Sequence, residues 1–132
     1  MTHLESEVTA VDIKHRVVVF DATDLETESS FWAALVGGTV ERNDGWHMIF
    51  VDSAPVLAVQ HAPDHEPPHW PVGAQQQQVH HDLWVDDYAS AHEEVSRLGA
   101  TLLRPTSADG RERWAVYADP AGHPFCLCWM EE

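Results

Sequence analysis

Apolar runs alternate along the chain with acidic and glycine-containing turns, and the pattern predicts one series of elements that occurs twice. Residues 15–21 (HRVVVFD) are β-branched and aromatic, which favours a strand. Asp24 is a suitable N-cap for a helix that continues to about Val36, where a glycine pair ends it. Three further strands are predicted at about 39–42, 46–51 and 56–61.

The same order of elements returns in the second half. We predict a strand at 79–85, a helix at 88–98, and strands at about 100–104, 113–118 and 124–130. Matching landmarks lie at similar separations, since Asp24 and Asp87 are 63 residues apart and Trp46 and Trp114 are 68 apart. The chain therefore contains two copies of one βαβββ unit.

These copies predict the domain organisation. The modules span about 14–61 and 79–130, a linker rich in Pro and Gln spans 62–78, and residues 1–12 form a frayed lead-in. A chain of 132 residues suits a single domain, here of the α+β class. Each module should form a mixed sheet covered on one face by its helix. The other faces should line a cup between the modules.

Charge and composition exclude several classes of protein. The formal net charge is −15, and the seven Lys and Arg residues form no basic stripe, so we expect no nucleic-acid partner. An acidic surface attracts cationic small molecules. The alternative is that it serves only to keep the protein soluble. No apolar run approaches 18 residues, and the first residues lack the apolar segment of a signal peptide. We expect a cytoplasmic protein that does not cross a membrane.

Four segments carry a family resemblance. They are FDATDLETESSFWAALVGG (20–38), HHDLWVDD (80–87), LGATLL (98–103) and WAVYADPAGHPFCLCW (114–129). Together they resemble the vicinal oxygen chelate superfamily, and within it the glyoxalase-like group related to bleomycin-resistance and dioxygenase proteins. The resemblance implies a cup that holds a small ligand or a metal ion. Members often form dimers, and their sheets pair either within one chain or between chains.

The resemblance also implies where a metal would bind. Metal-using members place His or Glu ligands on the first and last strands of each module. These positions correspond here to Val17, Gln60, His80 and Cys126. Only His80 keeps the usual ligand type, so any single divalent ion would be held by His80, Gln60 and Cys126. Glyoxalase I activity is not expected, because its four-ligand set is absent.

Strand alternation predicts which other side chains face the cup. Expected there are Val17, Val19, Asp21, Gln60, His80, Asp82, Trp84, Cys126 and Cys128. His80 and Asp82 form a candidate general acid/base pair, and Asp21 is a third catalytic candidate because it closes an apolar strand. The alternative is that these groups only satisfy polar atoms at the rim. The remaining members of the set would contact the ligand.

Two functions remain open. The chain could be a lyase, isomerase or dioxygenase that binds and transforms a small organic molecule. It could instead be a metal-free protein that sequesters a cationic aromatic compound, as in antibiotic-resistance relatives. Trp70 in the linker is either a lid over the cup or an ordinary packing residue, whereas Trp32, Trp114 and Trp129 are predicted to be core.

Overall fold

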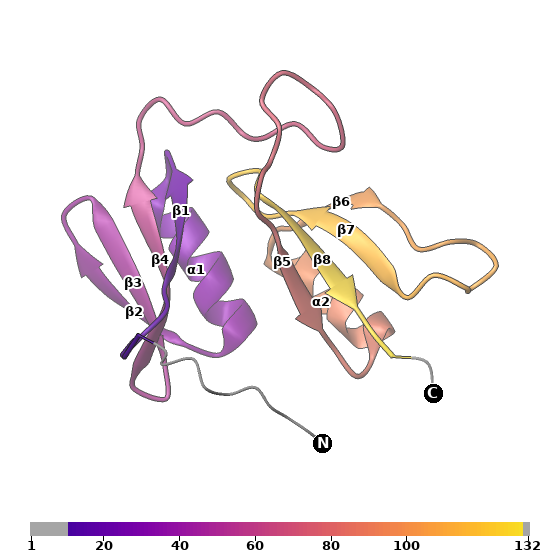
Figure 1. Cartoon of the computed structure of the whole chain (residues 1–132), viewed down its shortest axis with the longest axis horizontal. Coiled ribbons are helices and arrows are strands. Elements are labelled where there is room, and N and C mark those ends of the chain that lie inside the picture. The colour runs from indigo at the N-terminus through magenta and orange to yellow at the C-terminus, as the bar shows by residue number, and fades with distance from the viewer. Residues whose placement is uncertain (1–10, 131–132) are drawn as a thin grey trace.

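Two βαβββ modules make up the computed structural model, which describes residues 11–130 (Figure 1). The first ten residues of the predicted lead-in lie outside that range. The first module contains β1 (Val18–Ala22), α1 (Leu25–Val36), β2 (Thr39–Asn43), β3 (Trp46–Val51) and β4 (Ala54–His61). The second contains β5 (His81–Trp84), α2 (Tyr88–Leu98), β6 (Thr101–Arg104), β7 (Trp114–Ala118) and β8 (Pro124–Cys128). The predicted α+β class is confirmed.

Both sheets have the same topology. Their strand orders are β1-β4-β3-β2 and β5-β8-β7-β6. In each, the first strand pairs parallel with the last, and the other pairs are antiparallel. The helix supplies part of the long crossover that a parallel pair requires. None of the helices in residues 11–130 is long and apolar enough to cross a membrane.

The two helices begin with the same local interaction. The Asp24 carboxylate accepts a hydrogen bond from the backbone N–H of Thr27 at 3.1 Å, and Asp87 accepts one from Ser90 at 3.4 Å. Each aspartate also accepts a bond from the hydroxyl of the same partner residue. These bonds lower the pKa of both aspartates, because they favour the charged form.

Helix α1 lies between the first sheet and the second module (Figure 1). Trp32 stacks on Phe20 of its own module at 5.1 Å and meets Phe125 of the other module edge-on at 5.3 Å. One core therefore includes buried residues of both helices and both sheets: Phe31, Trp32, Ile49, Leu57, Val95, Tyr117, Phe125 and Leu127. The helix-facing sides of the sheets share this core, and the opposite faces are left outside it.

A buried carboxyl pair also joins the modules. Glu28 from α1 and Asp119 from the turn after β7 are 1% and 3% exposed, and their side chains are hydrogen-bonded to each other. The Trp32 indole N–H donates to Asp119 at 2.8 Å, and the backbone N–H of Ala121 donates to Glu28 at 2.9 Å. Burial, followed by the bond to Asp119, raises the pKa of Glu28 to about 10. Glu28 is therefore protonated at neutral pH and donates to Asp119.

Candidate functional site

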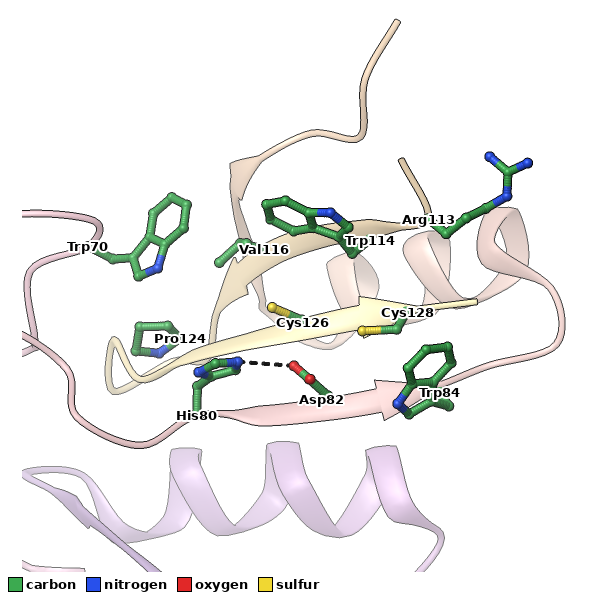
Figure 2. A pocket seen from close by; sticks show the side chains of 10 residues that line it. All are labelled: Trp70, His80, Asp82, Trp84, Arg113, Trp114, Val116, Pro124, Cys126 and Cys128. Atoms are coloured by element: carbon green, nitrogen blue, oxygen red, sulfur yellow. Dashed lines mark ion pairs between the residues drawn. The ribbon is translucent and has the colours of Figure 1, made fainter. Parts of the chain in front are cut away.

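The second sheet presents a row of functional side chains on the face away from α2. Asp82 lies beside Cys126 in the parallel ladder, and Trp84 lies beside Cys128. Parallel partners share a face, so these four side chains line one surface (Figure 2). His81, one residue out of phase, turns to the core and contacts Trp32 edge-on at 5.6 Å.

This surface is hollowed into a cavity of about 440 Å³. Its lining is mostly apolar and aromatic: Trp70, His80, Asp82, Trp84, Arg113, Trp114, Val116, Pro124, Cys126 and Cys128. Trp70 comes from the linker and lies beside one end of the sheet, as Figure 2 shows. A volume of this size and an apolar lining with few polar groups are typical of a small-molecule site.

Several residues that line the cavity were not predicted to lie there. Trp114, predicted as core, is 37% exposed and lines the cavity. It pairs with Cys128 and Val116 pairs with Cys126, so strand alternation along β7 was the signal for both. Arg113 was not predicted, and it lies at the end of the cavity beyond Trp114 (Figure 2).

The polar centre of the cavity is the pair His80 and Asp82. His80 Nε2 lies 3.1 Å from Asp82 Oδ1, and both side chains are about half exposed. An imidazole held by a carboxylate at this distance can donate or accept a proton from a bound molecule.

The two thiols beside this pair are poor nucleophiles in the free protein. Burial, followed by the nearby charge of Asp82, raises the pKa of Cys126 to about 12. The same causes raise the pKa of Cys128. A thiol attacks as its thiolate, so neither cysteine is activated for covalent catalysis.

The predicted candidates from the first module lie elsewhere. Val19 pairs with Ala58 and Asp21 with Gln60 on the outer face of the first sheet, and Val17 precedes β1. The described lining of the 440 Å³ cavity includes none of these residues. Val19 and Asp21 instead border a separate depression with His65 and His123. One chain thus brings together His80, Asp82, Trp84, Cys126 and Cys128, and leaves Val17, Val19, Asp21 and Gln60 apart.

The strand registers correct one correspondence between the modules. Val19 and Asp82 each lie five residues before their helix N-cap, and their ladder partners are Ala58 and Cys126. Asp21 and Trp84 are likewise equivalent, and their partners are Gln60 and Cys128. Cys126 therefore corresponds to Ala58, and Gln60 corresponds to Cys128.

This register bears on the metal site that the resemblance implies. Its four positions become Val17, Ala58, His80 and Cys126, and neither Val nor Ala has a ligand atom. The residues present do not fit a four-ligand site, and Gln60 is not at a ligand position. His80, Asp82 and Cys126 nevertheless have ligand atoms within 4.8 Å of one another.

The duplicated βαβββ fold and the cavity on one sheet define a glyoxalase-like protein. The sequence profile of the Glyoxalase-like domain matches residues 17–128, and the chain belongs to that family. The resemblance to the vicinal oxygen chelate superfamily is confirmed. A comparison with curated proteins gave no match.

Solved structures share the fold at low sequence identity. The fosfomycin resistance protein FosX from Mesorhizobium loti has a TM-score of 0.65 and 17% identity, over 93% of this chain and 95% of its own. A glyoxalase-related enzyme from Fulvimarina pelagi has a TM-score of 0.64 and 18% identity, over 89% of each chain. A glyoxalase/bleomycin resistance protein/dioxygenase family enzyme from Burkholderia phytofirmans PsJN has a TM-score of 0.64 and 15% identity, over 87% and 97%.

Proposed function

We propose that this chain binds a small planar aromatic compound that carries a positive charge, on the outer face of its second sheet. The proposal rests on the residues that line the 440 Å³ cavity, which include three tryptophans and one carboxylate. Tryptophan faces bind flat apolar groups and cations alike. Among the described lining residues, Asp82 is the only carboxylate, and it lies between His80 and Trp84 (Figure 2).

Charge favours the same class of ligand. The chain carries a formal net charge of −15, which attracts cations over the whole surface. Arg113 is the one permanent cation in the described lining, and its guanidinium points away from His80 and Asp82 (Figure 2). A cationic ligand can therefore lie against Asp82 without lying against Arg113.

We propose further that a second copy of the chain closes the site. Every described residue that lines the cavity belongs to the linker or the second module, and Trp84 is 64% exposed within one chain. On the first sheet, Val19 is 43% exposed on the outer face. Placing the first sheet of one copy over the second sheet of the other would cover Trp84 and Val19 and complete the predicted cup. Val17, Val19, Asp21 and Gln60 then complete the site across the dimer.

A matched pair of probes tests the proposed ligand class. N-methylquinolinium and 1-methylnaphthalene have nearly the same shape and differ in charge. We expect the cation to quench tryptophan fluorescence with an affinity about 2- to 30-fold higher, the range that a cation over an aromatic face provides. Asp82→Asn should reduce that difference, and Trp84→Ala should weaken the binding of both probes. Equal affinities for the two probes, or no binding of either, would contradict the proposal.

A second candidate function rests on the contact between His80 and Asp82. At 3.1 Å the two form an acid/base pair open to the cavity, which suits a lyase or isomerase that moves a proton on the bound molecule. The test is solvent deuterium exchange into a bound ligand, followed by NMR. Deuterium exchange that is lost in His80→Gln while ligand affinity is unchanged would support an enzyme. Absence of exchange in the wild type would contradict the enzyme and support only the binding function.

A further inference from the structure

Three potential ligands converge in the cavity without help from the first module. Ligand atoms of His80, Asp82 and Cys126 all lie within 4.8 Å of one another, and His80 Nε2 is 3.1 Å from Asp82 Oδ1. Metal–ligand bonds of about 2.0–2.3 Å in a tetrahedral site place the ligand atoms about 3.3–3.8 Å apart. The three side chains therefore need only small rotations to share one ion.

The backbone holds these ligands in place. Asp82 and Cys126 are ladder partners on adjacent parallel strands, so their side chains leave the sheet side by side. His80 lies two residues before Asp82 and points to the same face, as Figure 2 shows. Asp82 and Cys126 are therefore held by paired strands, which position side chains more rigidly than loops do, and His80 directly precedes β5.

We infer that His80, Asp82 and Cys126 form a three-ligand site for a thiophilic divalent ion such as zinc. The two ligand positions of the first module hold Val17 and Ala58, which have no ligand atom. Asp82 supplies the third ligand instead. A set of one imidazole, one carboxylate and one thiolate suits zinc or cobalt(II), whereas magnesium and calcium require oxygen ligands. The site differs from the family's arrangement because a single module supplies every ligand.

A three-ligand site would also leave one coordination position of the ion free. Because His80, Asp82 and Cys126 all line the cavity, a tetrahedral ion held by them would have its fourth position open to the cavity. A bound ion would also occupy Asp82, which is the carboxylate proposed to attract an organic cation. Metal and organic cation should therefore exclude each other, and their affinities should fall reciprocally.

Cobalt(II) titration of the full chain, after treatment with a chelator, tests the site. We expect one cobalt per chain, with a thiolate-to-cobalt charge-transfer band and the intense visible bands of tetrahedral coordination. Cys126→Ser should remove the charge-transfer band. His80→Gln and Asp82→Asn should each weaken binding at least about tenfold, because even the loss of an outer-shell partner of a metal ligand costs about 10- to 100-fold.

Two variants serve as matched controls. Cys128→Ser removes the neighbouring thiol on the same strand face, and His61→Gln removes an exposed histidine on β4 of the other module. Both should keep the cobalt spectrum, and circular dichroism checks that every variant is folded. Cobalt binding without a charge-transfer band, or a band that persists in Cys126→Ser, would overturn the inference, as would no binding at all. This readout uses no organic probe, so it can fail or succeed independently of the proposed function.

Discussion

At the residue scale, the carboxyl pair at the module interface makes stability depend on pH. The pKa of Glu28 is about 10 in the folded chain, well above that of a solvated glutamate. Between these two values the folded state holds a proton that the unfolded state has released. Stability contributed by this group therefore falls as pH rises from about 4.5 towards 10.

Glu28→Gln should remove this dependence. A glutamine amide can accept from the backbone N–H of Ala121 and donate to Asp119, as the protonated carboxyl does. We expect the melting temperature of the wild type to fall between about pH 6 and pH 9, and that of Glu28→Gln to change much less. Calorimetry at several pH values measures both.

Glu28→Ala is the informative comparison for this pair. It removes the titrating group, but it also removes the hydrogen bond from Glu28 to Asp119 and opens a void, so it should destabilise the chain at every pH. If Glu28→Gln kept the wild-type pH profile, the shifted pKa would belong to another group. The sequence could not indicate this pair, because Glu28 resembles an ordinary first-turn residue and its partner lies 91 positions away.

At the element scale, the repeated N-caps make a prediction that applies to both modules. Asp24→Ala and Asp87→Ala each remove the acceptor for a backbone N–H in the first turn of a helix. We expect each to lower the melting temperature by about 3–6 °C, because the lost cap leaves that donor unsatisfied. Thermal denaturation followed by circular dichroism provides the measurement.

Asparagine variants separate capping from charge. Asp24→Asn and Asp87→Asn keep an acceptor oxygen at the N-cap, so they should retain most of the stability that alanine loses. If asparagine were as harmful as alanine, the negative charge would matter more than the cap.

The helices were predicted well because their signals are local. The predicted N-cap Asp24 and the predicted last helical residues Val36 and Leu98 agree with the structure. The strand predicted at 79–85 is shorter, at His81–Trp84. Among the described strands β5 is an edge strand that pairs with β8 alone, and β8 pairs with those four residues. His80 therefore precedes the strand, although its side chain still reaches the predicted face.

At the scale of the whole molecule, the repeat could not predict which faces of the two sheets lie against each other. Alternation correctly placed Asp82, Trp84, Cys126 and Cys128 on one face, since it depends only on register within a sheet. It does not specify whether that face meets the first module of the same chain. The contact between α1 and the second module, through Trp32 and its neighbours, separates the two faces.

The proposed dimer can be tested by a charge placed on the first sheet. Val19 is 43% exposed in a single chain, so Val19→Glu should leave the folded monomer intact. In the dimer the same side chain would enter the closed cup, where an unpaired carboxylate costs several kcal/mol. We expect the dissociation constant of the dimer to rise at least about tenfold, which sedimentation analysis across a concentration series measures.

Ala34→Glu supplies the matched control, because it adds the same charge at an exposed position of α1. This variant should dimerise like the wild type, and both variants should melt close to the wild-type temperature when compared as monomers. Equal dimerisation of Val19→Glu and the wild type would place the interface elsewhere. A wild type that stays monomeric at all concentrations would mean that one chain binds its ligand on an open face. Among residues 11–130, Trp70 would then be the one cavity residue from outside the second module.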